Sequence, residues 1–186
     1  MNNYNNDTLS IIVTYNPENV SKLNTIIEII SYESDVILID NSDDEKIILD
    51  IASTIISAKF LIQFKENKGL AFAQNIGIEK ALYLNYKFVL LLDDDSIPEE
   101  NFILNILSLF HEIVKESKGS VGSISARPLF VNGNKPIDLS NAKINFKNKF
   151  TRYNLMNSSG TLIPTSVLRD VGSMNEDLFI DLVDFD

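Results

Sequence analysis

The amino-acid sequence predicts an α/β fold with a mostly parallel central sheet flanked by helices. In the first 118 residues, four short apolar segments each precede a segment whose apolar residues recur at helical spacing. Such alternation of strand and helix favours parallel strands joined by helical crossovers. The five consecutive apolar residues at 88–92 are typical of a strand buried on both faces, as in sheets covered by helices on each side.

Each strand of this region is predicted from its apolar run and each helix from its periodicity or its start signals. Strands are expected at residues 9–15, 35–40, 59–65 and 88–92. The first helix is expected to begin at Asn16 and Pro17, since Asn caps helices and Pro suits a first turn. The fourth is expected to begin at Pro98. The apolar helix faces comprise Leu23, Ile26, Ile27 and Ile30; Ile48, Ile51 and Ile55; Leu70, Ala73, Ile76, Gly77, Ala81 and Leu84; and Phe102, Ile103, Ile106, Leu107, Phe110 and Val114.

The pattern becomes less regular after about residue 118. A short strand is expected within 120–126, a loop-rich excursion at 127–141, and a hairpin strand within 142–153. A strand at 158–163 then leads into a short helix that begins at Pro164 and ends near Gly172. The final residues are apolar but carry three Asp residues, and they stop without terminal capping, as though the chain had been cut within a site.

Composition limits the classes of protein to which the chain can belong. Its 186 residues suit one domain with a substantial core. The net charge of −10 disfavours a nucleic acid or an anionic membrane surface as partner, and is compatible with binding a divalent cation. The absence of Cys excludes disulfides and thiolate metal sites. The polar N-terminus does not resemble a signal peptide, and no apolar run reaches the roughly 20 residues of a membrane helix, so cytoplasmic residence is the default expectation.

Polar residues follow three of the four predicted strands. They are Thr14-Tyr15-Asn16, Asp40-Asn41-Ser42 and Asp93-Asp94-Asp95. The carboxyl ends of parallel strands share one edge of the sheet, where open α/β sheets bind their ligands, so a nucleotide-sized site is expected there. Three adjacent carboxylates repel one another unless a cation or ligand lies among them. The alternative is an acidic loop exposed to water.

Five motifs in this order resemble those of glycosyltransferase family 2. They are Ile12-Val13-Thr14-Tyr15-Asn16; Ile39-Asp40-Asn41-Ser42; Asn67-Lys68-Gly69-Leu70-Ala71 with Ala73, Asn75 and Gly77; Leu91-Leu92-Asp93-Asp94-Asp95-Ser96; and the pair Ser158-Ser159-Gly160 and Phe179-Ile180-Asp181-Leu182-Val183-Asp184. The last pair most resembles the rhamnosyltransferase-like branch. The resemblance implies the GT-A fold and an inverting, nucleotide-sugar-dependent enzyme. It also implies a single domain, with a nucleotide-sugar-binding half at 1–118 and the start of an acceptor half at 119–186.

The resemblance assigns roles to the acids after the fourth strand. Asp95 is expected to be the direct ligand of Mg²⁺ or Mn²⁺, which prefer hard oxygen ligands. Asp93 is expected to assist Asp95 in metal binding, with its carboxylate lying towards the ribose or towards a metal-bound water. Asp94 would lie at the variable position of this donor-binding motif, with its carboxylate pointing away or towards solvent. Because all three residues are Asp, the motif can be placed one residue either way.

The remaining donor-site residues come from the other motifs. Asp40 would accept a hydrogen bond from the imide N–H of a uracil or thymine base, since a carboxylate is only an acceptor; the alternative is a cap or turn residue. Thr14 and Tyr15 would line the base pocket, or pack. Asn67 and Gly69 match the motif before the third helix, where Gly69 would allow close approach to the nucleotide or begin the helix.

The acceptor side rests on one residue, Asp184, which falls at the position of the family's catalytic base. An inverting reaction needs such a base for the acceptor hydroxyl. The alternative is that the acids around Asp184 cap a terminal helix. Family members normally continue beyond this point, so the chain is expected to be a truncated piece or an unusually short protein.

The function expected from the resemblance is transfer of a sugar from a nucleoside diphosphate to a glycan or lipid-linked acceptor, in bacterial surface polysaccharide synthesis. The donor would be a dTDP- or UDP-sugar, first of all dTDP-L-rhamnose. No transmembrane segment is expected, and peripheral association with the inner face of the membrane stays open. A non-catalytic nucleotide-sugar-binding domain is the alternative. A P-loop NTPase and a dinucleotide oxidoreductase are disfavoured because their Gly-rich loops are missing.

Overall fold

The computed structural model describes residues 7–117, 121–126, 144–146, 150–152 and 157–179. Its central feature is a six-stranded sheet with the order β3-β2-β1-β4-β8-β5. The strands are β1 (Thr8–Thr14), β2 (Asp35–Asp40), β3 (Phe60–Gln63), β4 (Phe88–Asp93), β5 (Ile124–Ser125) and β8 (Thr161–Pro164). Strands β1 to β4 are mutually parallel, whereas β8 is antiparallel to both β4 and β5. The predicted mostly parallel sheet is therefore confirmed.

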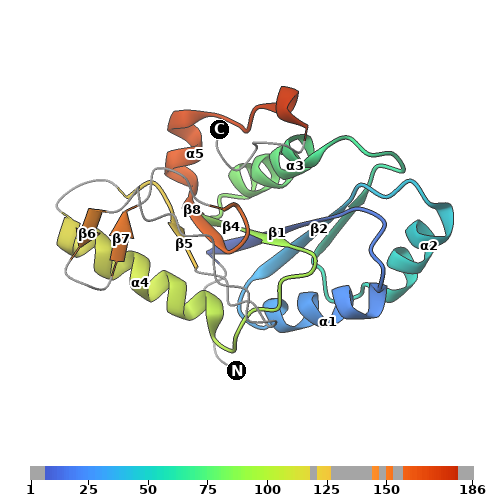
Figure 1. The fold of residues 1–186 in the computed structure, drawn as a ribbon, viewed down its shortest axis with the longest axis horizontal. Helices are drawn as coiled ribbons and strands as arrows, with labels where there is room; N and C mark the ends of the chain where they lie inside the picture. The colour runs from blue at the N-terminus through green and yellow to red at the C-terminus, as the bar shows by residue number, and fades with distance from the viewer. Residues whose placement is uncertain (1–6, 118–120, 127–143, 147–149, 153–156, 180–186) are drawn as a thin grey trace.

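Helices cover both faces of this sheet (Figure 1). One face packs against α1 (Val20–Ser31), α2 (Glu45–Thr54) and α4 (Phe102–Ser117), and the other against α3 (Leu70–Tyr83) and α5 (Thr165–Val171). A separate antiparallel pair, β6 (Ile144–Phe146) and β7 (Phe150–Arg152), forms the hairpin expected within 142–153. A short 3₁₀ helix, η2 (Glu176–Leu178), follows α5. Strand β8 lies beside β4, so residues beyond 118 complete the same sheet.

The strands are continuously apolar because alternate side chains enter two different cores. In β4, Leu90 and Leu92 pack under α1 and α4, while Val89 and Leu91 face α3 and α5. Side chains of this kind each contribute roughly 1.5–3 kcal/mol when fully buried. A strand that is buried on both faces therefore lacks the alternation of apolar and polar residues seen in a strand with one face exposed to solvent.

Helix α3 lies unusually close to the sheet at Gly77. A Cβ atom at this position would lie 2.7 Å from the side chain of Ile11 on β1, which is itself buried. Since Ile is branched at Cβ and held in a packed core, it cannot move aside without strain. Gly77 therefore allows α3 to pack closely against β1. This packing also determines where the N-terminus of α3 lies relative to the carboxyl edge of the sheet.

Two predicted helix starts are wrong. Helix α1 begins at Val20, and Asn19 caps it by accepting a hydrogen bond from the Lys22 amide at 2.9 Å. Asn16 instead has a φ of 44° and bonds to the loop after β2. Helix α4 begins at Phe102, and the Glu33 carboxylate accepts from two of its first-turn amides, at 3.0 and 3.1 Å. Pro98 precedes the helix.

The loop expected at 127–141 and the acidic segment at 180–186 lie outside the described residues. Within the described part, α5 ends as predicted at Gly172, whose φ of 96° suits the residue after a helix. None of the described helices combines the length and the apolar character needed to cross a membrane.

Candidate functional site at the carboxyl edge of the sheet

The carboxyl ends of β1, β2 and β4 bring three of the predicted site residues onto adjacent strands. Thr14 on β1 pairs in register with Asp40 on β2, and Val13 pairs with Asp93 on β4. The expected grouping of these strand ends at one edge of the sheet is therefore confirmed. The site is built from this edge, the loop after β2 and the N-terminus of α3.

The acids after β4 do not all point the same way. Asp93 and Asp95 are exposed, whereas Asp94 is only partly exposed and its Oδ2 accepts a hydrogen bond of 2.5 Å from Thr14 Oγ1. The expectation that Asp94 points towards solvent is wrong, whereas the other expected direction, away from the donor, stays a prediction. The turn places the carboxylate of Asp94 against β1, whereas Asp93 and Asp95 on either side of it are exposed. Burial raises the pKa of Asp94, although the hydrogen bond from Thr14 and the amine of Lys22 act in the opposite direction.

A serine from the second half of the chain supports this turn. Ser159 Oγ accepts from the Asp93 amide at 3.1 Å and lies 3.2 Å from Ser96 Oγ. The next residue, Gly160, donates its amide to the Leu91 carbonyl at 2.8 Å and has a φ of 75°. Only glycine adopts that backbone conformation without strain. The Ser158-Ser159-Gly160 segment therefore fixes both ends of the acidic turn.

Asp40 is buried at the end of β2, with 0% of its surface exposed. Its Oδ1 accepts from the Ser42 amide at 2.9 Å, and its Oδ2 accepts from Gln63 Nε2 at 2.9 Å. These bonds shape the turn after β2 and join it to β3. Each carboxylate oxygen has a second acceptor site. The contact of Asp40 with a nucleotide base stays a prediction.

The loops after β1 and β2 are joined around Asp43. Asn16 Nδ2 donates to Asp43 Oδ1 at 2.7 Å, and Tyr15 OH donates to Oδ2 at 3.2 Å. The bond from Asn16 lowers the pKa of Asp43. Tyr15 itself is 48% exposed, so its ring offers a surface at the mouth of this edge rather than filling the core.

Asn67 and Gly69 form the turn that begins α3. Asn67 Oδ1 accepts from the Gly69 amide at 2.9 Å, and the Gly69 carbonyl accepts from Asn41 Nδ2 at 3.1 Å. Gly69 has a φ of 89°, and a Cβ there would lie 2.7 Å from the Phe179 ring. Glycine is thus required by the backbone and by the close approach of residue 179. This approach is a contact that the sequence did not predict.

The donor atoms at this edge suit a hard divalent cation. No cluster of three or more acidic or histidine side chains arranged to hold a metal occurs in the described ranges. Mg²⁺ typically needs only one or two carboxylates, with phosphate oxygens and water completing its shell. The exposed carboxylates of Asp93 and Asp95 on one turn meet that requirement. Asp184 lies outside the described residues, so its predicted role is untested.

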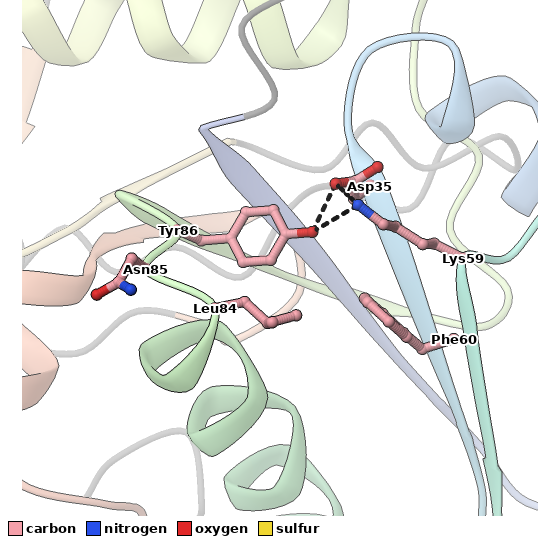
Figure 2. A pocket seen from close by; sticks show the side chains of 6 residues that line it. All are labelled: Asp35, Lys59, Phe60, Leu84, Asn85 and Tyr86. Atoms are coloured by element: carbon pink, nitrogen blue, oxygen red, sulfur yellow. Dashed lines mark hydrogen bonds and ion pairs between the residues drawn. The ribbon is translucent and has the colours of Figure 1, made fainter.

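A hollow of about 410 Å³ lies at the opposite edge of the sheet, among residues at the amino ends of β2, β3 and β4. Figure 2 shows that the side chains of Asp35, Lys59 and Tyr86 point at one another, whereas that of Asn85 points away from them. Lys59 Nζ lies 2.6 Å from Asp35 Oδ2, and Tyr86 OH donates to the same oxygen at 2.5 Å. The bond to Asp35 raises the pKa of Lys59, and burial raises the pKa of Tyr86. We interpret this cluster as structural.

Several residues that build the site were not predicted to belong to it. Asp43 and Gln63 are among them, and Ser42 was expected at this edge of the sheet without a role of its own. The signal was the same as for the predicted residues: a polar side chain directly after, or at the end of, a buried strand. Asn75 was noted in a motif without a role, yet it is buried in α3 and bonded to residues 174 and 176.

Similarity to known proteins identifies the family to which this chain belongs. The family model "Glycosyl transferase family 2" matches residues 10–172, so the chain belongs to that family. With the sheet described above, this membership identifies the fold as the GT-A type that the motifs implied.

A particular relative is the dTDP-rhamnosyl transferase RfbF of Shigella flexneri. The chain is 30% identical to it over 197 aligned residues, which cover 97% of this chain and 61% of that protein. The chain thus spans less than two thirds of the length of this curated relative.

Two solved structures also match. A putative nucleotide-diphospho-sugar transferase from Desulfovibrio desulfuricans G20 matches with 10% identity and a TM-score of 0.42, over 56% of this chain and 55% of that one. A 4-diphosphocytidyl-2C-methyl-D-erythritol synthase from Anaerococcus prevotii matches with 13% identity and a TM-score of 0.43, over 92% of this chain and 81% of that one.

Proposed function

We propose that this chain forms the donor-binding part of an inverting, metal-dependent glycosyltransferase. The donor would be dTDP-L-rhamnose, and the acceptor a glycan or lipid-linked saccharide in bacterial surface polysaccharide synthesis, at the cytoplasmic face of the membrane. Membership of glycosyl transferase family 2 and similarity to a dTDP-rhamnosyl transferase support the reaction class and the donor. The observation that carries the proposal is the acidic turn, with Asp94 bonded to Thr14 and with Asp93 and Asp95 facing outward.

The turn would bind the diphosphate of the donor through a divalent cation. Asp95 would be a direct ligand, with Asp93 beside it. The cation, Mg²⁺ or Mn²⁺, supplies positive charge that offsets the negative charge growing on the departing nucleoside diphosphate. The Ser159 hydroxyl, which accepts from the Asp93 amide, would keep the turn in position.

The neighbouring loops would bind the nucleoside. Tyr15 is half exposed at the end of β1 and offers an aromatic face to a base. Asp40 would accept from the imide N–H of thymine through one of its remaining acceptor sites. Asn67 and Gly69 would bring the N-terminus of α3 close to the nucleotide, where the positive end of the helix dipole favours negative charge although the Leu70 amide is bonded to Phe179.

The protein's remaining task is to remove a proton from the acceptor hydroxyl. Asp184 would accept that proton as the hydroxyl oxygen attacks the anomeric carbon opposite the leaving group. Its carboxylate would be ionised before the reaction and protonated after it. No metal is required for this proton transfer.

Calorimetry with dTDP and Mn²⁺ tests the donor site. We expect dTDP to bind in the presence of Mn²⁺. In Asp95→Ala this binding should weaken at least about 10–100-fold, because loss of a metal ligand should cost no less affinity than loss of a residue that hydrogen-bonds to a ligand. Asp170→Ala, an exposed acid on α5, is the control. Unchanged binding in Asp95→Ala would refute the assignment. A thermal-shift comparison of dTDP-, UDP- and GDP-sugars, with and without Mn²⁺, identifies the nucleotide.

Replacement of the predicted base separates binding from transfer. Asp184→Asn keeps the size of the side chain but cannot accept a proton, so donor affinity should stay unchanged while kcat falls about 10²–10⁴-fold. The measurement is release of dTDP in the presence of an acceptor saccharide. Undiminished turnover would exclude Asp184 as the base. Donor binding without any transfer by the unmodified protein would instead support a non-catalytic donor-binding domain.

A further inference from the structure

We propose that Asn75 is a positioning residue for transfer, because its carboxamide holds the segment that leads to Asp184. This inference rests on the function proposed above. The segment consists of residues 174–179, and Asp184 follows five residues after Phe179 in the sequence. Asn75 lies on α3, five residues after Leu70, the first residue of the helix at the donor edge.

The Asn75 side chain is buried and makes three hydrogen bonds to this segment. It is 2% exposed, and its Nδ2 donates to the Met174 carbonyl at 2.9 Å and to Glu176 Oε1 at 2.8 Å. Its Oδ1 accepts from the Met174 amide at 2.8 Å. A primary amide can both donate and accept through one planar group, which neither a carboxylate nor a hydrocarbon can do. The match explains why an amide is present here.

A second anchor holds the other end of the segment. The Leu70 amide donates to the Phe179 carbonyl at 2.6 Å. First-turn amides have no acceptor within their own helix, so residue 179 satisfies one that α3 leaves open. Phe179 has a φ of 53°, an uncommon conformation for a residue with a side chain, and it lies against Gly69. Contacts with α3 therefore fix both ends of residues 174–179.

Apolar packing cannot fix this segment by itself. Residues 175–177 and 179 are exposed, and η2 contains no buried residue. Met174, at the start of the segment, packs against the core under α3 and α5, but residues 175–177 bury little apolar surface, so the contribution from burial beyond Met174 is small. Beyond the packing of Met174, the hydrogen bonds of Asn75 and Leu70 restrain the segment, and Asn75 is the side chain whose loss would release it.

The same anchors connect the segment to the donor edge. Asn41 donates its side chain to the Gly69 carbonyl and its backbone amide to the Thr14 carbonyl, at 3.1 and 2.8 Å. Thr14 in turn donates to Asp94. Bonds thus run from the acidic turn, through Asn41 and Gly69, to the contact with Phe179. A base that takes the proton from an acceptor hydroxyl attacking a donor held by this turn needs such a connection, since an error of about 1 Å in placement can cost about 10²-fold in rate.

The variant Asn75→Leu tests the inference, because Leu has the same branched side-chain skeleton as Asn and forms none of the three bonds. We expect the amides of residues 174–179 to exchange with deuterium faster, dTDP affinity to stay within about threefold, and kcat to fall about 10–100-fold. Asn75→Asp should also lose activity, since it cannot donate and lies against Glu176. The double variant Asn75→Asp/Glu176→Gln should regain part of that activity, because the Gln amide can donate to the new carboxylate.

Ser34→Ala is the control for loss of stability. It removes the buried bond between Ser34 Oγ and Ser10 Oγ, 2.7 Å long, away from the donor edge. We expect its kcat to match that of the unmodified protein. Faster exchange in Asn75→Leu with unchanged kcat would overturn the proposal. A loss of dTDP affinity in Asn75→Leu as large as its loss of kcat would also overturn the proposal. So would a double variant Asn75→Asp/Glu176→Gln with no more activity than Asn75→Asp. Failure of the unmodified protein to bind dTDP would instead refute the proposed function, and the exchange data would still show whether Asn75 holds the segment.

Discussion

The two edges of the central sheet hold their acidic residues in different ways. At the amino ends of the strands, Asp35 accepts from Tyr86 and forms an ion pair with Lys59 (Figure 2). At the carboxyl ends, Asp40 accepts hydrogen bonds from the backbone amide of Ser42 and the side-chain amide of Gln63. Asp94 accepts a hydrogen bond from the hydroxyl of Thr14. The first arrangement neutralises the carboxylate within the protein. The second bonds the carboxylates to neutral donors, and Lys22 offsets the charge of Asp94 only in small part.

This difference separates a stabilising cluster from a binding site. Opposite charges favour each other's ionised forms, and the pKa of Lys59 is accordingly raised by its bond to Asp35. At the other edge, burial raises the pKa of Asp94, which means that its charge is unfavourable in the folded protein. Proteins tolerate such unfavourable charges where they are used, and a bound cation would offset them.

The largest change in stability is expected at the amino edge, in Lys59→Met. This variant keeps the apolar stem of the side chain but removes the cation beside Asp35, whose side chain is only 13% exposed. Lys59 itself is 49% exposed, so solvent screens the pair and the cost lies between those of exposed and buried pairs. We expect unfolding in urea to show a loss of about 1–2 kcal/mol at pH 7, with dTDP affinity unchanged.

The pH dependence of stability checks the same cluster. The folded pKa values of Lys59 and Tyr86 are both raised, from 10.5 and 10.0, so the folded protein holds these protons more tightly than the unfolded chain. Their contribution is complete below pH 10 and is lost as the pH rises through the folded values. The double variant Lys59→Met/Tyr86→Phe should lose less stability above pH 10 than the unmodified protein. An equally steep loss would show that the cluster does not stabilise the fold.

The sequence predicted the fold better than the directions of its site residues. Strands β1, β2 and β4 could be placed because two-sided burial requires a continuous apolar run, which is visible without knowing the partners. The cap of α4 could not be predicted, since it comes from Glu33 in the turn between α1 and β2, 70 residues away. A cap of this kind depends on tertiary packing rather than on local sequence.

The site shows the same limit. The sequence identified the acidic run after β4, but three identical residues gave no indication of which carboxylate turns inward. That choice depends on the turn, which Ser159 fixes from a distance of 66 residues in the sequence. The contact between Gly69 and Phe179 likewise required the structure, because residue 179 follows an irregular segment. Edge residues could therefore be named in advance, whereas the bonds among them could not.

The smallest expected change in stability is at Asp94, and its sign is opposite to that expected for Lys59→Met. Asp94→Asn removes a charge that burial disfavours, while its amide oxygen can still accept from Thr14. A carboxyl whose folded pKa is raised stabilises the protein below its unfolded pKa of about 3.8, and this contribution is lost as the pH rises through the folded value. At pH 7 the variant should thus be slightly more stable, by less than about 1 kcal/mol.

The matched change at the amino edge is Asp35→Asn, which should destabilise the protein because it removes the partner of Lys59. Thermal unfolding of both variants at pH 7 and pH 4 measures the contrast. The gain of Asp94→Asn should shrink at the lower pH, since Asp94 in the unmodified protein takes up a proton more readily than an ordinary Asp. If both substitutions destabilise the protein equally at pH 7, Asp94 is a structural residue like Asp35, and the two edges do not differ in the way proposed.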